Sequence, residues 1–394
     1  MIQLVKKEEC CGCKACEQIC PQNCIIMEND KEGFWYPQID FSKCIKCNLC
    51  EIACPVNNLR INDRTRCYVM QSKEQNRLYN SSSGGIFSTI SELVFAKEGV
   101  IFGAGFDEKW SVKHKKAISI AELQILQKSK YVQSDINNTY KEVKELLEEG
   151  IQVMYTGTPC QINGLSSFLR KDYENLILID IICHGVPSPG LWNYYLNEYI
   201  GRKIGGVNKI TKIDFRDKRF GWRNYSLGIK NGCKYLYSKT VESDPYLVAF
   251  QNNITLRPSC YQCYFHEGMR RSDITIADCW GADQIVPSWD KDDIGISLVV
   301  SHTNKGDEIL ESVKEQVKWE EISLENAVKY NRNYFESALK NPKREIFFRE
   351  IFFGDFSKVV NKYCECSNKK KIKKEIKKVI WFLKKVIRSI KTHK

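Results

Sequence analysis

The sequence of 394 residues lacks several features that would assign it to a common class of protein. No stretch approaches 18 consecutive apolar residues, so we expect no membrane-spanning helix. No apolar segment precedes the first cysteine, so we expect no signal peptide and a cytoplasmic location. Neither a G-x-G-x-x-G fingerprint nor a Walker loop occurs, which disfavours a conventional nicotinamide or ATP site.

Acidic residues are almost absent from the C-terminus. Residues 369–394 carry twelve Lys and Arg against one acid, Glu375, and so hold nearly all of the net charge of +12. The charge of the main body therefore gives no reason to expect a nucleic-acid partner. We predict a basic amphipathic helix over residues 368–394, suited to peripheral contact with the inner face of an anionic membrane. Packing of this helix on the body or on a partner is the alternative.

Cysteine is abundant, with nineteen residues, ten of them before residue 60. Disulfide-rich scaffolds are typically short and secreted, whereas cysteines this numerous in a reducing compartment are more often metal ligands. The run Cys10-x2-Cys13-x2-Cys16-x3-Cys20-Pro21 returns with identical spacing as Cys44-x2-Cys47-x2-Cys50-x3-Cys54-Pro55. This internal repeat predicts two related metal centres.

The spacing is that of bacterial ferredoxins, in which the fourth cysteine of each run binds the other cluster. We therefore predict an α+β ferredoxin-like domain over residues 1–60 with two [4Fe-4S] clusters. The ligands expected for the first cluster are Cys10, Cys13, Cys16 and Cys54, and those for the second are Cys20, Cys44, Cys47 and Cys50. Zinc knuckles fit poorly, because they need a longer spacer between two cysteine pairs. The remaining Cys11 and Cys24 are expected to be small buried residues.

From Cys67 the pattern becomes that of an α/β core, with predicted segments at 67–150 and 151–360. Short apolar runs predict strands at Val100–Phe106, Ile151–Tyr155 and Leu176–Ile182. Amphipathic stretches predict helices at Ile86–Ala96, Thr139–Glu149 and Gln161–Arg170. The last two strands and the helix opened by Thr158-Pro159 form one βαβ unit, so we expect the two strands to be parallel neighbours.

Four later cysteines are brought together by this topology. Cys160 and Cys183 follow the carboxyl ends of the two parallel strands, at the sheet edge where open α/β folds bind ligands. Cys260-x2-Cys263 adds a second thiol pair, and the four thiols suffice for a third cluster. Single buried cysteines are common, however, and a Cys-x2-Cys pair also serves redox or zinc sites. The other cysteines are expected to be structural: Cys67, Cys233, Cys279, Cys364 and Cys366.

Small residues directly precede the helix predicted from Ile86. The sequence Ser81–Gly85 would expose the first backbone N–H groups of that helix to a phosphate or diphosphate. An ordinary N-cap explains the same residues.

Seven motifs in order between residues 67 and 305 resemble the coenzyme F420 hydrogenase/dehydrogenase beta-subunit family. They are Ser82–Gly85, Ser129–Ser134, Gly157–Gln161, Cys183–Ser188, Phe215–Lys218 with Gly221-Trp222, Arg257–Cys263 and Ser272–Thr275. With a ferredoxin domain in front, the arrangement is similar to bacterial members associated with polysaccharide gene clusters. The resemblance implies an FAD-dependent oxidoreductase that passes electrons between iron–sulfur clusters and an organic acceptor.

The resemblance also implies roles for single residues. FAD would be held by Ser82, Ser83, Gly84, Gly85, Lys130, Tyr131 and Thr158, and the third cluster by Cys160, Cys183, Cys260 and Cys263. His184 is expected to donate a proton or to hydrogen-bond the flavin, with a packed imidazole as the alternative. Lys130 and Arg216 are expected to bind an acidic substrate or the cofactor, with a solvated surface charge as the alternative.

The resemblance leaves the acceptor open. Archaeal members reduce coenzyme F420 and a plant relative reduces a chlorophyll intermediate; reduction of F420 is not favoured here. Cys279 stands where relatives often carry Phe, so the set of third-cluster ligands is also open. We expect ferredoxin or a similar protein as the electron donor. The competing hypotheses are a non-catalytic subunit that relays electrons to a partner enzyme, and a cluster-based redox sensor.

Overall fold

The computed structural model describes residues 6–61, 64–289 and 291–364. The predicted tail at 368–394 and Cys366 lie outside these residues. No helix within the described ranges combines the length and the apolar character needed to cross a membrane.

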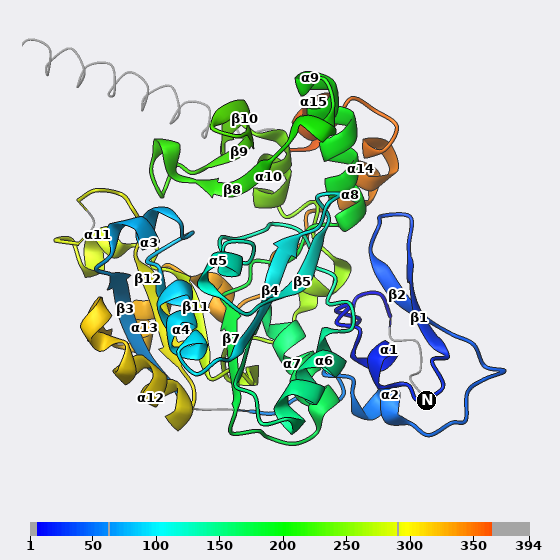
Figure 1. The fold of residues 1–394 in the computed structure, drawn as a ribbon. Helices are drawn as coiled ribbons and strands as arrows, with labels where there is room; N and C mark the ends of the chain where they lie inside the picture. Colours follow the sequence, from blue (N-terminus) through cyan, green and yellow to red (C-terminus); the bar gives the residue numbers. More distant parts are fainter. Residues whose placement is uncertain (1–5, 62–63, 290, 365–394) are drawn as a thin grey trace, which may run out of the picture.

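An eight-stranded mixed sheet forms the centre of the molecule, in the order β13-β3-β12-β11-β7-β6-β4-β5 (Figure 1). Its strands are β3 (Arg66–Ser72), β4 (Val100–Phe106), β5 (Val112–Ala117), β6 (Val153–Gly157), β7 (Leu176–Ile181), β11 (Ile274–Asp278), β12 (Ser297–Ser301) and β13 (Val317–Ile322). The inner strands β4, β6, β7 and β11 are parallel to one another, whereas the outer pairs are antiparallel. The predicted segments 67–150 and 151–360 therefore share one sheet.

The predicted βαβ unit is present as β6, α7 (Pro159–Leu169) and β7, with Val153 opposite Leu176 in parallel register. Helix α7 begins two residues earlier than predicted, because proline is favoured in the first helical turn and the Thr158 N–H is bonded by the Gln161 side chain at 3.1 Å. Strand β6 begins two residues later than predicted, after the left-handed turn at Gly150 (φ 81°) that follows α6 (Thr139–Glu148).

Successive residues of the central strands alternate between two apolar cores. Val153 and Tyr155 pack with α6 and α7 on one face of the sheet. Met154 packs on the other face with α4 (Ile86–Phe95) and α12 (Asn304–Ser312). The sheet is therefore covered on both faces, as the near-continuous apolar runs of its parallel strands require.

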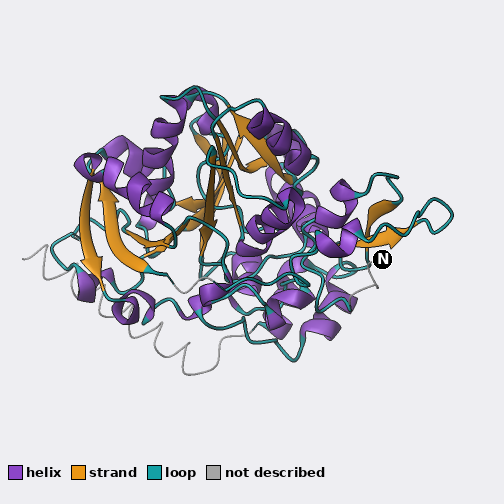
Figure 2. Ribbon diagram, turned by 90° about the horizontal axis from the view of Figure 1, so that it is seen from below, coloured by secondary structure: helices purple, strands orange, loops and turns teal. Residues whose placement is uncertain are grey.

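The N-terminal module lies beside α6 and α7 (Figure 1). It contains α1 (Ala15–Ile19), an antiparallel hairpin of β1 (Ile25–Asn29) and β2 (Trp35–Ile39), and α2 (Leu49–Ile52). Figure 2 shows this hairpin at one end of the molecule. The module is docked closely: the Gln18 side chain accepts a hydrogen bond from the backbone N–H of Tyr140 in α6 at 3.1 Å.

A second, three-stranded antiparallel sheet is built from β8 (Lys212–Asp217), β9 (Ser226–Asn231) and β10 (Lys234–Thr240). Its aromatic-rich core includes Trp192, Phe215 and Tyr246, and also Phe34 and Tyr36 of the N-terminal module. The helices around this sheet are α8 (Pro189–Tyr194), α9 (Arg202–Ile204), α10 (Pro245–Gln251), α14 (Arg344–Ile351) and α15 (Phe356–Tyr363). The shorter helices elsewhere are α3 (Gln75–Tyr79), α5 (Ile120–Leu123), α11 (Ala282–Ile285) and α13 (Leu324–Val328). The N-terminal module therefore packs into two separate apolar cores, the one beside this sheet and the one that contains α6 and α7.

Candidate functional site

One cavity opens at the surface of the N-terminal module. It is lined by the thiols expected for the second cluster, which are Cys20, Cys44, Cys47 and Cys50. Cys47 is exposed, whereas Cys50 is buried. The loop from Cys44 to Cys50 turns through left-handed conformations at Lys46 (φ 56°) and Asn48 (φ 61°), which curl it around the cavity. We call this group the outer thiol set.

A second group, the inner thiol set, consists of the ligands expected for the first cluster: Cys10, Cys13, Cys16 and Cys54. Burial raises the pKa of Cys16, and the neighbouring charges of Cys10 and Cys54 raise it further. Burial likewise raises the pKa of Cys54, to which Cys10 adds. Cys16 and Cys54 are therefore protonated in the absence of metal, and iron binding must release their protons.

A second cavity lies at the carboxyl edge of the parallel strands, where β6 and β7 end. Its lining includes Cys160, Cys183, Cys260 and Cys263, which we call the core thiol set. Backbone N–H groups donate to two of these sulfur atoms: Val186 to Cys260 and Phe265 to Cys263, each at 3.4 Å. Burial raises the pKa of Cys260 to about 12. Residues from three distant segments therefore meet as the spacing and topology predicted.

Cys279 does not line this cavity. It packs with Cys67 in an apolar cluster beneath β12 and α13. The structure therefore favours the four cysteines of the core thiol set over any set that includes Cys279.

The outer and core thiol sets each line a cavity. In the described part of the chain, no group of three or more His, Cys, Asp or Glu side chains could hold a single metal ion. Zinc needs four ligands that meet at one atom, whereas each cysteine around an iron–sulfur cluster binds a different iron. Thiols spread around a cavity are the arrangement that an iron–sulfur cluster requires.

Comparison with protein families agrees with this chemistry. Residues 9–64 match the 4Fe-4S dicluster domain, and residues 151–327 match the C-terminal region of the coenzyme F420 hydrogenase/dehydrogenase beta subunits. The chain therefore resembles this beta-subunit family over residues 151–327. It is an iron–sulfur electron-transfer protein of the F420 hydrogenase/dehydrogenase group.

Comparison with individual proteins gives less information than comparison with protein families. No curated protein matches the chain. Among solved structures, it is similar to a chain of the F420-reducing [NiFe] hydrogenase complex from Methanosarcina barkeri, at 15% identity and a TM-score of 0.48, over 75% of this chain and 94% of that one.

Two cysteines that the spacing had left over lie at the thiol sets. Cys13 of the inner set raises the pKa of Cys11, and Cys160 of the core set also acts on it, so the Cys11 thiol lies near both; Cys11 also lines the core cavity. The Cys24 sulfur lies 3.4 Å from that of Cys20 and lines the outer cavity. Both are buried, as expected, but neither is remote from the metal sites. Nothing in their spacing indicated this, because both depend on how the chain folds back.

The family motifs meet at a second place, around Ser82. The Ser82 hydroxyl oxygen accepts a hydrogen bond from the Ser129 N–H at 2.8 Å, and its carbonyl accepts one from Arg216 at 3.2 Å. Gly84 is wedged between β3 and β12: an added Cβ would lie 2.6 Å from the Met70 carbonyl oxygen. The Gly84 N–H is already bonded to the Ser297 hydroxyl, so it is not a free donor for a phosphate.

Four basic residues surround this place, which we call the basic cluster: Lys128, Lys130, Arg216 and Lys218. Among the described residues, two carboxylates form ion pairs with them, with Asp214 paired to Lys128 and Asp278 paired to Arg216. Burial lowers the pKa of Lys130 to about 7. Burial and the nearby Arg216 charge lower the pKa of Lys218 to about 7. An additional anion bound here would relieve this repulsion.

The remaining predicted residues are distributed between the two sites. Thr158 lies at the core thiol set, with its hydroxyl 3.2 Å from the Cys160 sulfur. His184 lines the core cavity, and its Nε2 lies 2.6 Å from the Asn253 side-chain oxygen. Lys130 donates to the Ile125 and Gln127 carbonyls of its own loop, at 3.1 and 2.7 Å.

Tyr131 connects the two sites. Its hydroxyl accepts a hydrogen bond from Arg216 at 3.1 Å, and its ring stacks on Phe250 with centroids 4.9 Å apart. Phe250 in turn contacts the His184 ring at 5.0 Å. The core thiol set and the basic cluster are therefore separated by only two aromatic side chains.

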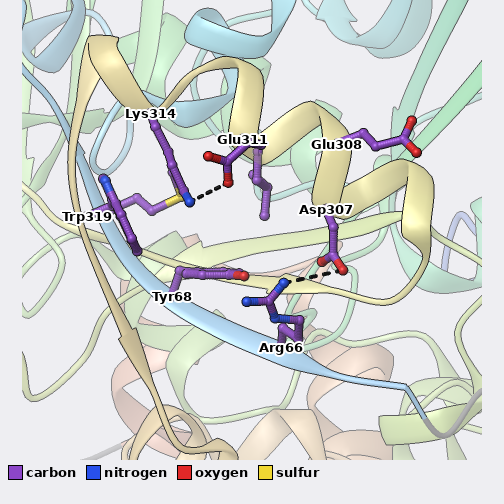
Figure 3. A pocket seen from close by; sticks show the side chains of 9 residues that line it. Arg66, Tyr68, Asp307, Glu308, Glu311, Lys314 and Trp319 are labelled. Atoms are coloured by element: carbon purple, nitrogen blue, oxygen red, sulfur yellow. Dashed lines mark ion pairs between the residues drawn. The ribbon is translucent and has the colours of Figure 1, made fainter.

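A further pocket lies apart from all of these residues, between β3, β13 and α12 (Figure 3). Lys314 pairs with Glu311 and lies 4.2 Å from the Trp319 ring centroid, while Arg66 pairs with Asp307 at 3.6 Å. Both cations of the pocket wall are thus neutralised by carboxylates of the same wall. It therefore offers no unpaired cation to a phosphate-bearing cofactor.

Proposed function

We propose that this protein is an FAD-dependent iron–sulfur oxidoreductase that carries electrons from a ferredoxin-type donor to an organic acceptor. Clusters transfer single electrons, and a flavin accepts electrons singly and delivers them as a pair. The three thiol sets would hold the clusters. The basic cluster, beside Ser82 and Ser83, would hold the FAD diphosphate.

The observation that carries this proposal is the spatial order of the sites. The outer set is exposed at Cys47, and Cys11 lies between the other two sets, because it lines the core cavity with Cys160 and Cys13 raises its pKa. Phe250 and Tyr131 then separate the core set from the basic cluster. A surface-to-core series of this kind suits electron transfer into a buried cofactor.

An orphaned polar atom supports an anionic cofactor at the basic cluster. Arg216 is 2% exposed, yet its Nε has no hydrogen-bond partner among the described residues. A buried donor without an acceptor costs about 1–3 kcal/mol, which a diphosphate oxygen would recover. Arg216 also stacks on Tyr225 at 4.2 Å, so its guanidinium is already fixed in place.

The direct test is anaerobic purification followed by cofactor analysis. We expect bound FAD and roughly twelve iron atoms per chain, four from each cluster. Dithionite should bleach the flavin absorbance, and a small-molecule acceptor should restore it. Colourless protein that contains zinc would contradict the proposal.

A second test uses the exposed outer set. The Cys47→Ser variant should contain less iron and should show slower flavin reduction by ferredoxin, because one outer ligand is lost, while its FAD content stays unchanged. Wild-type reduction kinetics in this variant would exclude the outer set from the electron path.

The alternative function is a relay subunit without a catalytic site. The clusters alone would suffice for it, so it predicts iron without flavin in the purified protein. Arg216 distinguishes the two functions further: Arg216→Met should release FAD from an oxidoreductase and change nothing in the electron-transfer rate of a relay.

A further inference from the structure

Arg257 is a fully buried cation that lies between two of the thiol sets. Its guanidinium has no solvent exposure, and it lines the core cavity. It also reaches the N-terminal module: Nε donates to the Cys10 carbonyl at 2.7 Å, and Nη2 lies 3.6 Å from the Cys10 sulfur. These two residues are 247 positions apart in the sequence.

No carboxylate neutralises this cation. Among residues whose side chains the structure describes, no Asp or Glu forms an ion pair with Arg257; its other acceptors are the Trp35 carbonyl at 2.9 Å and the Gln133 side-chain oxygen at 3.2 Å. Glu9 lines the same cavity, but its carboxylate accepts from the Lys6 N–H. A buried charge without a counter-charge is strongly unfavourable, so buried charges are almost always paired or bound to a metal site.

The groups that do face Arg257 are thiols and a phenol. The titratable groups that act on it electrostatically are Cys10, Cys11, Cys260 and Tyr36. The Tyr36 ring stacks on the guanidinium at 4.3 Å, which keeps water away from it. Within the described part of the chain, the available counter-charge is therefore the negative charge of metal-bound thiolates.

We propose that Arg257 sets the reduction potential of the cluster held by the inner thiol set. This inference rests on the iron–sulfur part of the proposed function and does not depend on FAD. One-electron reduction adds a negative charge to the cluster and its thiolates, with no proton or bond change. A buried guanidinium stabilises the reduced form more than the oxidised form, so it raises the potential and favours electron transfer inward.

The chain supplies a matched control in Arg344. This residue is also buried, also joins the N-terminal module to the core, and donates to the Leu256 carbonyl at 3.0 Å. It differs in having its own carboxylate partner: it pairs with Glu32 through two bonds of 2.8 and 2.5 Å. Loss of Arg344 therefore removes a similar contact between the N-terminal module and the core, but it removes no positive charge from beside a thiol set.

The test is a redox titration of the anaerobically purified holoprotein, followed by electron paramagnetic resonance of the reduced clusters. The inner-set signal is identified by its loss in the Cys54→Ser variant. We expect Arg257→Gln to lower the inner-set midpoint by about 59 mV, a tenfold change for one electron, because a charged hydrogen bond is lost. Arg257→Lys keeps the charge and should shift the midpoint less. Arg344→Gln should leave it unchanged.

Each outcome decides the proposal. An unchanged midpoint in Arg257→Gln with full iron content overturns it, as does an equal shift in Arg344→Gln. If Arg257→Gln loses iron while Arg344→Gln keeps it, the role of Arg257 as a counter-charge is supported. The midpoint potential of the inner set is then measured in Arg257→Lys and compared with that of wild type. Iron loss in both Gln variants identifies a merely structural clamp and overturns the proposal. A wild-type protein without clusters would instead contradict the proposed function itself.

Discussion

His114 illustrates how burial fixes a protonation state at the scale of single residues. It is 2% exposed and stacks on Tyr155, with ring centroids 5.1 Å apart. Its Nε2 lies 2.9 Å from the Thr156 carbonyl and its Nδ1 lies 3.1 Å from the Ser134 hydroxyl. The neutral tautomer with a proton on Nε2 satisfies both contacts, and burial lowers the pKa of His114 to about 4.

This lowered pKa predicts a loss of stability in acid. The unfolded chain binds the His114 proton near pH 6.5, so the free energy of unfolding falls as the pH drops from about 6.5 to about 4. The loss for this one residue is about 2 kcal/mol between pH 7 and pH 5. His302, with a pKa also lowered to about 4 by burial, should contribute similarly.

The measurement is urea unfolding of wild type and His114→Gln at both pH values. The variant cannot titrate at this position, so the pH-dependent drop should shrink by roughly half. An identical drop in the two proteins would contradict the assignment.

At the scale of elements, helix α7 joins the sheet to the iron–sulfur module. Its first turn carries Cys160, and one turn later Gly164 faces the module. An added Cβ at Gly164 would lie 2.8 Å from the Tyr140 hydroxyl and 3.0 Å from the Cys13 Cβ. No side chain larger than hydrogen fits between this helix and the inner thiol set.

We therefore expect Gly164→Val to displace the module. Overpacking of a well-packed contact costs about 1–3 kcal/mol, and the displacement of Cys13 should remove about four iron atoms per chain. The measurements are iron content and the thermal unfolding midpoint. Ser166→Ala, on the same helix, is the control and should retain full iron. Full iron in Gly164→Val would show that the module tolerates a separation from α7.

At the scale of the whole molecule, the thiol sets are ordered from the surface toward the core. The outer set faces solvent, while the inner set faces α7 and the core cavity. The surface beside the outer cavity carries exposed Ile45 (61%) and Phe41 (63%). Within residues 41–50, Lys46 adds a positive charge, whereas Lys43 is paired with Asp40 at 3.1 Å. This combination suits brief contact with an acidic electron-carrier protein, because apolar contact and charge attraction act together.

We predict that Ile45→Glu slows reduction by an acidic two-cluster ferredoxin about tenfold at low salt, because it removes apolar contact and adds a repulsive charge. Reduction by dithionite should stay unchanged, since this small reductant does not need the surface. Phe353→Glu is the control, because Phe353 is 90% exposed and lies outside the module. Stopped-flow absorbance measures both rates. Equal slowing by the two substitutions would place the contact elsewhere.

Short-range features of the site were accessible from the sequence. The repeated cysteine runs gave the two N-terminal ligand sets, and apolar periodicity gave β4 with its bounds and the βαβ unit behind Cys160 and Cys183. Cys260 and Cys263 were added because two further thiols complete a set of four, and all four line one cavity. The bounds that differ by two residues are the start of α7, at Pro159, and both ends of β6, whose start follows the left-handed turn at Gly150.

The order of residues along the chain was enough to predict the chemistry of this protein: which side chains serve as soft metal ligands, how they are spaced, and which strands are buried. Three-dimensional packing alone established how these parts face one another, such as Arg257 against Cys10, Cys11 against Cys160, and Arg216 against Ser82. The physical reason is the distance along the chain over which each feature acts. Ligand spacing and periodicity act over a few residues along the chain, whereas the pairing of a buried charge depends on which distant segments packing brings into contact.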